Sequence, residues 1–277
     1  EGPPAPRAVD RSRCTAARAG QTWTDVARRL GTADVAGVRI VSGGPPAPLS
    51  GMRACRPDLL PAYDPDGRSA RYVRALFETF LGRPATAHDA EHHATLLDRG
   101  ALDHLGLATA LARSDEYLGR AIDELYRAAL DRPVDPGGLA TWRAAIRRGT
   151  SLAEVAVHVY GSPELRQRAG GTDTAFVDEL YRRLLGREAD DGGRAHWVAI
   201  LSGGAPDAEV ARSFHASLEA RRDRVARVYA HVLGRAPDPG GLAHWAARLA
   251  TVDDVVLAAT LATSAEYVAL AERPQTT

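Results

Sequence analysis

The chain has 277 residues, of which 45% are hydrophobic and 25% charged, and its 35 basic residues balance 35 acidic ones. This is the composition of a globular protein, and the zero net charge argues against a nucleic-acid or anionic-membrane partner. No run approaches the roughly 18 apolar residues of a membrane-spanning helix. There is no lysine and no asparagine, which excludes a lysine Schiff base, a phosphate-loop lysine and an N-glycosylation acceptor.

The two cysteines, Cys14 and Cys55, flank one short segment. An isolated pair of this kind is typical of a disulfide in an exported protein, and the alternative is two free thiols in a cytosolic one. The first residues, Glu1 to Pro4, contain no methionine, which suggests signal-peptide removal or a trimmed chain. We therefore expect a secreted protein with a Cys14–Cys55 disulfide.

A flexible arm is predicted for residues 1–13, which are rich in proline and arginine and show no period. Residues 14–56 form a small unit. A short strand leads into a helix that Thr22 or Thr24 caps and Gly31 ends, and a weaker helix follows. Residues 38–41 fit either the end of that helix or an extended segment, and residues 49–55 fit a turn and a strand.

This unit resembles the LysM family, a small βααβ module. The matching features are Gly20-x-Thr22, Val26-Ala27-x-x-Leu30-Gly31 and Leu49-x-x-Gly51-Met52. The resemblance implies that the first and last strands, which carry Cys14 and Cys55, pair side by side.

LysM modules bind glycans that contain N-acetylglucosamine, such as peptidoglycan or chitin. The resemblance places the groove at two loops, and the implied glycan-binding residues are Gly20, Gln21, Thr22, Trp23, Ser42, Gly43 and Gly44. The chain departs from the family pattern at Gln21, where an Asp is usual, and in lacking the Asn that usually ends the second helix. Trp23 fits two roles, a sugar-stacking indole at the groove or a core residue of the small unit.

A linker is predicted at residues 57–68, with a turn at Asp64-Pro65-Asp66-Gly67. The alternative, a Ca²⁺ loop, requires a Glu at its twelfth position, which is Ala75. The turn is therefore the preferred interpretation.

Residues 69–272 are predicted to be all helical and to contain four repeats, at 69–120, 121–170, 171–222 and 223–272. A pattern of Leu-Gly-Arg, Asp-x-Gly-Gly and Trp occurs at residues 185–197 and 233–245, with Asp131 replacing the first Gly at 130–142. A worn copy begins at Leu81, with His93 where the Trp should be. The spacings between Tyr126, Tyr181 and Tyr229 equal those between the three Trp residues, which indicates true repeats with one insertion around residues 169–173.

Each repeat has the same predicted plan. A first helix ends at Leu-Gly-Arg, a second carries the Trp, a third includes residues 152–160, and a last helix starts at Ser-x-Glu. Ser151 and Glu154 are predicted to form a capping box. In repeats one and three the last helix can continue into the next first helix, over residues 114–130 and 217–233.

The repeated residues are best explained by structure. The Asp suits an N-cap, the Gly pair allows a bulky neighbour to approach the backbone, and the preceding Arg132, Arg187 and Arg235 could pair with the Asp. A Trp at helical spacing indicates core, with sugar stacking as the alternative, and a cation or phosphate site at the loops is the alternative for the Asp. The structural repeat residues are Asp135, Trp142, Asp190, Trp197, Asp238 and Trp245.

His88 and His92, four residues apart in the worn copy, could ligate one metal from a helix face. No third ligand is identified, and a decayed, exposed helix explains the same residues. His196 and His244 match Thr141 in repeat two and are predicted to lie on the surface.

No residue is predicted to be catalytic and no cofactor is expected, because no nucleophile elbow, HExxH motif, dinucleotide loop or Cys–His pair is present. The repeats, carried by Leu180-Tyr181-Arg182 through Trp197 and by Ser162-Pro163-Glu164, resemble a secreted bacterial family known as domain of unknown function 4214. They are distantly similar to phycobilisome linker domains.

The resulting fold class is mainly α, with a small βααβ LysM-like domain followed by an all-α domain of four helical repeats. We expect a secreted, non-enzymatic envelope protein that binds cell-wall glycan, with an unknown protein partner for the repeats. The alternatives are a glycan-processing enzyme with a site between the repeats and a self-assembling structural protein.

Overall fold

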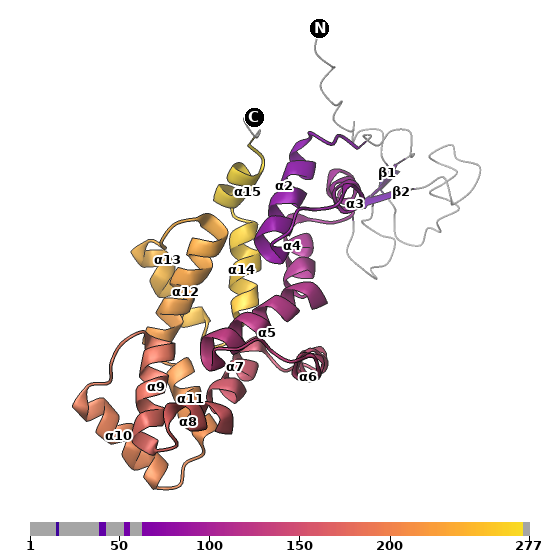
Figure 1. Cartoon of the computed structure of the whole chain (residues 1–277). Coiled ribbons are helices and arrows are strands. Elements are labelled where there is room, and N and C mark those ends of the chain that lie inside the picture. The colour runs from indigo at the N-terminus through magenta and orange to yellow at the C-terminus, as the bar shows by residue number, and fades with distance from the viewer. Residues whose placement is uncertain (1–14, 17–38, 43–52, 56–62, 274–277) are drawn as a thin grey trace. The chain divides into compact units, whose positions relative to one another are not determined.

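The computed structural model describes residues 15–16, 39–42, 53–55 and 63–273 (Figure 1). Between residues 63 and 273 every regular element is a helix, as predicted. These residues fall into two compact units, one of residues 63–108 and 268–273 and one of residues 109–267.

Three short strands are described in the N-terminal part: β1 (Thr15–Ala16), β2 (Arg39–Ser42) and β3 (Arg53–Cys55). They pair antiparallel in the order β1-β3-β2, with Ala54 opposite both Thr15 and Ile40. The segment that the sequence left ambiguous is therefore extended from Arg39, which suits its β-branched Ile and Val. The predicted helices of the βααβ module lie outside the described residues.

The first unit begins with the predicted turn, in which the Gly67 N–H donates to the Asp64 carbonyl at 3.1 Å and the Asp66 N–H to the Asp64 side chain at 3.0 Å. The helix that follows is apolar at spacings of three and four and buries Tyr72 and Val73 completely. The elements with residues in this unit are α2 (Arg68–Leu76), the π-helical turn η4 (Phe77–Leu81), α3 (Ala87–Asp98), α4 (His104–Ala112) and α15 (Ala265–Ala271).

The second unit carries repeats two to four. Its helices are α5 (Asp115–Leu130), α6 (Pro136–Arg147), α7 (Leu152–Tyr160), α8 (Pro163–Ala169), α9 (Asp173–Leu185), α10 (Asp191–Ser202), α11 (Asp207–His215), α12 (Leu218–Leu233), α13 (Pro239–Arg248) and α14 (Asp254–Ala262). In each repeat the first helix packs on the Trp-bearing helix and on the helix after it: α5 on α6 and α7, α9 on α10 and α11, α12 on α13 and α14. The core between repeats two and three includes the fully buried Ile122, Leu165, Phe176 and Leu180.

Helices α5 and α12 are continuous across the boundaries of the predicted repeats, each capped by its Ser, as the sequence predicts. Repeat two differs, because α8 ends before α9 begins. Gly170 and Gly171 both have positive φ, at 113° and 80°, a conformation that residues with a side chain rarely adopt. The insertion is therefore a helix break built on two glycines.

The predicted capping box at Ser151 is only half formed. The Ser151 hydroxyl accepts from the Glu154 N–H at 3.1 Å. The Glu154 carboxylate does not return to the cap, because both its oxygens accept from Arg212 of α11 at 2.6 Å. A tertiary ion pair has replaced the local hydrogen bond.

Arg166 of α8 joins three helices. It donates to Asp207 of α11 and Asp173 of α9, and its guanidinium lies 4.8 Å from the centre of the Phe176 ring. These contacts raise its pKa, mainly through the Asp207 hydrogen bonds. The planar guanidinium of Arg166 can make both the carboxylate hydrogen bonds and the ring contact, whereas the ammonium of a lysine is not suited to both.

We expect Arg166→Lys to lower the free energy of unfolding by roughly 1–2 kcal/mol, since it loses the bidentate bond and the ring contact. The control is Arg168→Lys in the same helix, which is more exposed and pairs with Glu164 one helical turn away, and its effect should be below about 0.5 kcal/mol. Urea unfolding followed by circular dichroism measures both. Equal effects would show that the contacts of Arg166 with α9 and α11 contribute no more to stability than the exposed pair of Arg168 does.

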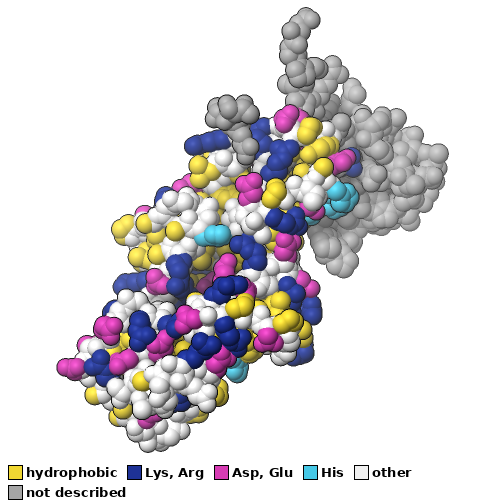
Figure 2. Space-filling view, viewed as in Figure 1, with side chains coloured by type: hydrophobic (Ala, Val, Ile, Leu, Met, Phe, Trp, Pro, Cys, Tyr) yellow, Lys and Arg dark blue, Asp and Glu magenta, His cyan; other side chains and the backbone are white. Residues whose placement is uncertain are grey.

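The surface carries interspersed charges of both signs over the face shown in Figure 2. No single helix among the described residues is long and apolar enough to cross a membrane. One bent pair, α14 with α15, passes that test only when the two helices are taken together.

Candidate functional site

Most of the predicted glycan-binding residues lie outside the described residues, as does Cys14. Ser42 is placed at the end of β2, where the sequence predicted a loop, and Cys55 ends β3. The glycan site and the disulfide therefore stay predictions.

The repeated Asp residues are N-caps, as predicted. The carboxylates of Asp135, Asp190 and Asp238 accept from the backbone N–H three residues later, at 2.9, 2.8 and 2.9 Å. These backbone hydrogen bonds lower the pKa of each carboxyl. The Asp side chains are thus engaged in holding the helix starts.

The repeated Arg residues have a different main partner from the one predicted. Each lies near its Asp in repeats two and three, at 4.0 and 3.7 Å, but donates two hydrogen bonds to the Glu of the Ser-x-Glu motif. The bidentate pairs, with distances of 2.6 to 3.0 Å, are Arg132–Glu164, Arg187–Glu219 and Arg235–Glu266. Both carboxylate oxygens of each Glu accept from the guanidinium, and such a bidentate pair is stronger than a single, longer contact with the Asp.

The same guanidiniums stack on the repeated tyrosines. The distances from the guanidinium carbon to the ring centre are 5.2 Å at Tyr126, 4.9 Å at Tyr181 and 5.6 Å at Tyr229. Two motifs that are separate in the sequence are therefore one assembly, in which Arg is held between a ring and a carboxylate. The nearly constant spacing between the Arg and the Glu, of 32, 32 and 31 residues, was the signal for it.

The Trp residues were predicted to lie in the core, and one copy is buried there. Trp245 is 9% exposed, whereas Trp142 and Trp197 are half-buried and pack against the edge of the core. The Trp142 indole N–H donates to the Tyr126 hydroxyl at 2.8 Å, and the Trp197 ring lies 5.1 Å from that of Phe214. His196 and His244 are exposed, as predicted.

The second glycine of each pair in repeats three and four lies under a tyrosine hydroxyl, which confirms the predicted close approach. A Cβ at Gly241 would lie 2.8 Å from the Tyr229 oxygen, and one at Gly193 would overlap the Tyr181 oxygen outright. At Gly192 a Cβ would meet only the Asp190 carboxylate, at an ordinary 3.5 Å.

We expect Gly193→Ala to lower the free energy of unfolding by about 1–3 kcal/mol, because the added methyl must displace Tyr181. The neighbouring Gly192→Ala should leave it unchanged or raise it by up to about 1 kcal/mol, because alanine favours helix. Thermal and urea unfolding of the two variants test this directly. A Gly193→Ala variant as stable as Gly192→Ala would show that Tyr181 is free to move.

The worn copy in repeat one is structurally intact, which corrects its interpretation as decayed. Thr86 stands in the register of the Asp, caps α3 and forms a capping box with Asp89. Arg83 lies 5.3 Å from the centre of the Phe77 ring, so Phe77 replaces the Tyr. His93 takes the place of the Trp and packs against the same ring at 5.8 Å.

The suggested metal pair, His88 and His92, is exposed on α3 with its ring centres 6.0 Å apart. His93 is turned inward, and its burial and the charge of His92 lower its pKa. Within the described residues no group of three or more His, Cys, Asp or Glu side chains is placed to hold a metal ion.

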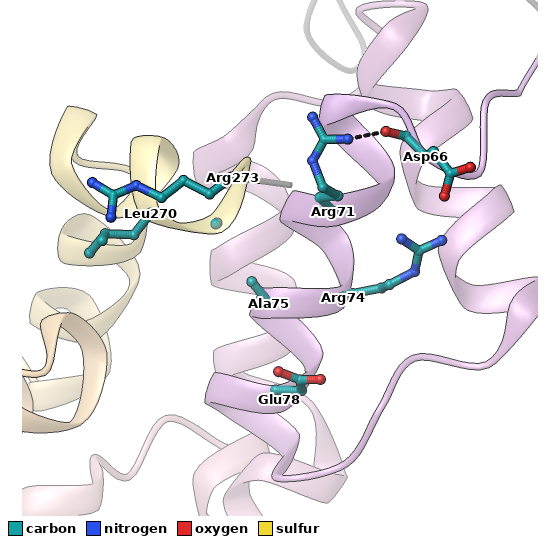
Figure 3. A pocket seen from close by; sticks show the side chains of 8 residues that line it. Asp66, Arg71, Arg74, Ala75, Glu78, Leu270 and Arg273 are labelled. Atoms are coloured by element: carbon teal, nitrogen blue, oxygen red, sulfur yellow. Dashed lines mark hydrogen bonds between the residues drawn. The ribbon is translucent and has the colours of Figure 1, made fainter. Parts of the chain in front are cut away.

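A cavity of about 470 Å³ in the first unit is lined by three arginines, two acidic residues and three apolar residues, most of which Figure 3 labels. Two of its arginines are engaged with the backbone. Arg71 donates to the carbonyls of Glu272, at 2.7 Å, and Asp66, and Arg74 donates to that of Pro65. These side chains hold chain segments together, which explains them without a ligand.

A second cavity, of about 360 Å³, lies where repeats two, three and four meet in the second unit. It is lined by residues of six helices, and two of these residues, His215 and Arg224, are buried polar side chains. We refer to it as the central cavity. The residues that line it are Tyr117, Ala121, Glu124, Leu125, Ala128, Leu152, Ala153, Ala156, Tyr160, Leu184, His215, Ala220, Arg224, Arg227, Val228 and Asp254.

Several polar groups of the central cavity have shifted pKa values. Burial, with the nearby Arg224 and Arg227, lowers the pKa of His215 to about 3. Burial raises the pKa of Asp254, and burial next to Asp254 raises that of Tyr117 to about 12. Apolar cavities with a few convergent polar groups and shifted pKa values are the usual setting of ligand-binding sites.

The sequence did not point to this site, because its residues are not part of the repeated motif. One of them, however, departs from the repeat. Arg224 follows its Ser217 at the position that Ala121, Ala169 and Ala271 occupy in the other copies. A charged residue where three repeats have alanine was a detectable signal.

Comparison with known proteins bears on part of the chain. No curated protein and no solved structure matches it. A family model does match residues 156–224, from α7 into α12, which include the whole Asp190–Trp197 motif and the buried His215 and Arg224. Over these residues the chain is similar to the family described as Domain of unknown function (DUF4214), which supports the helical repeats.

Proposed function

We propose that the chain is a secreted, non-enzymatic envelope protein that binds N-acetylglucosamine-containing glycan through residues 14–56 and uses its helical repeats as a scaffold for a protein partner. The glycan contact would be made by the loops at residues 20–23 and 42–44.

The scaffold role is supported by the contacts that the repeated motif makes within the protein. In repeats two to four its Asp caps a helix, its Arg is held by a Glu and a Tyr ring, and its Trp packs against the core. Polar groups committed to such contacts serve rigidity, and a rigid array of helices suits the presentation of a surface.

Sedimentation of the full chain with insoluble peptidoglycan and with chitin tests the glycan role. We expect the chain to pellet, and the double variant Gln21→Ala, Thr22→Ala to stay largely in solution. The matched control is Gln167→Ala, Thr174→Ala, which changes the same residue types at exposed positions of the repeats. A full chain that does not pellet with either polysaccharide would overturn the proposal.

A glycan-processing enzyme is the second candidate, favoured by the central cavity, which lies between repeats and carries the carboxylates of Glu124 and Asp254. Paired carboxylates are the groups that glycoside hydrolysis requires. Release of soluble sugars from the pelleted polysaccharide would favour it. Concentration-dependent assembly without pelleting would favour a structural protein instead.

A further inference from the structure

The central cavity has the size and lining of a small-molecule site. Its 360 Å³ fall within the range of known ligand pockets. Alanines of α5, α7 and α12 leave the space open, and Leu125, Leu152 and Leu184 complete an apolar wall. An apolar body placed there would be removed from water on several sides.

One end of the cavity holds a buried arginine whose hydrogen bonds are incomplete. Arg224 is 8% exposed, and its Nη1 donates to the His215 carbonyl at 2.9 Å. Its Nε lies 3.3 Å from the Asp254 carboxylate but is buried without a hydrogen bond. This Nε has no exposed surface, so it is closed to a ligand, and the guanidinium borders the cavity only as the ion-pair partner of Asp254.

The neighbouring Asp254 supplies the opposite chemistry. Its carboxylate lines the same cavity, keeps 35% of its side-chain exposure and can accept further hydrogen bonds. A ligand head with an N–H can therefore donate to Asp254. An amide is a simple uncharged group of this kind.

The charges around the cavity are already balanced. In the lining, Arg224 and Arg227 balance Asp254 and Glu124. Just outside it, Asp223 pairs with Arg227 at 3.0 Å and Arg120 pairs with Glu124 at 3.7 Å. An added carboxylate would meet Asp254, and an added ammonium would meet Arg224, so either would bring an uncompensated charge into a partly dry site. The balance selects an uncharged head.

We propose that the central cavity binds an uncharged amphipathic molecule, with an apolar body against the alanine and leucine wall and an amide head that donates to Asp254. The site is independent of the N-terminal glycan-binding role. An acyl amide, free or as part of a larger molecule, is the ligand chemistry that fits.

The test compares three probes of equal chain length against the full chain: hexanamide, hexanoate and hexylamine. Dissociation constants from ligand-observed NMR titration should lie in roughly the millimolar range for hexanamide, as expected for so few atoms. We expect the two charged probes to bind at least tenfold more weakly. Equal or tighter binding of either charged probe, or no binding of hexanamide, would overturn the proposal.

Variants locate the binding. Ala153→Leu fills the cavity from α7 and should weaken hexanamide binding at least tenfold, and Ala121→Leu should do the same from α5. The matched control Ala199→Leu, at an exposed position of α10, should leave binding unchanged. Circular dichroism confirms that each variant is folded. Unchanged binding by both folded cavity variants would show that the amide binds elsewhere and would overturn the proposal.

Discussion

Replacing Trp245 with alanine is expected to lower the free energy of unfolding by about 3–5 kcal/mol. Trp245 is 9% exposed, it contacts the first helix of its repeat through a hydrogen bond with Tyr229, and the fully buried Ala246 follows it. Removing the indole leaves a cavity that α12 and α13 cannot close, and it leaves Tyr229 without its partner. Urea unfolding followed by circular dichroism measures the loss.

The adjacent His244→Ala provides a matched control, because His244 is exposed on the same turn of α13. Its effect should stay within about 0.5 kcal/mol. Trp197→Ala, at a half-buried position, should fall between the two. If the three variants were equally stable, the repeated Trp would have no role in the core, and a surface role such as sugar stacking would become the better explanation.

The stability of the chain is expected to fall between pH 7.5 and pH 5 by about 2 kcal/mol more than in a His215→Gln variant. His215 is 9% exposed, and both its ring nitrogens lie within 2.8 Å of Arg224 Nη1, so the folded state keeps the imidazole neutral. Its folded pKa is lowered to about 3, against an unfolded value near 6.5. Below pH 6.5 the unfolded chain binds a proton at His215 that the folded chain does not bind. The stability that the neutral His215 contributes is therefore present above that pH and is lost as the pH falls.

Chemical denaturation at pH 7.5, 6 and 5 of the wild-type chain and the His215→Gln variant separates this effect from other titrations. The control is His196→Gln, an exposed histidine, which should follow the wild-type curve. The lowered pKa of His93 in the first unit acts in the same direction but is common to all three proteins. Parallel curves for wild type and His215→Gln would mean that the pKa of His215 is the same in the folded and the unfolded chain.

Local features of the fold were predictable from the sequence because they depend on neighbours along the chain. The Asp and Ser caps, the turn at residues 64–67 and the continuous helices α5 and α12 all follow from hydrogen bonds within a few residues. The register of the repeats was predictable for the same reason, and it held even in repeat one, where Thr86 and Phe77 replace the usual residues.

Partners far apart in the sequence were predicted less well. Arg132, Arg187 and Arg235 were expected to bond the nearby Asp, but each reaches a Glu of a distant helix. Glu154 was expected to close a local box, and Arg212 of α11 holds it instead. In both cases a charge-assisted tertiary contact outweighs a local one, and only the packing of helices brings the partners within reach.

The sequence by itself determined that this chain is a set of helical repeats with capped helix starts and with glycine pairs that a bulky neighbour approaches. It also carries a family resemblance, which the family model supports over residues 156–224. Only the tertiary structure decided where the polar residues of the central cavity meet. His215, Arg224 and Asp254 belong to different helices, and they face one cavity because three repeats converge on it. A repeat pattern fixes each unit through local interactions, whereas a site between units depends on how the units pack, which no single copy encodes.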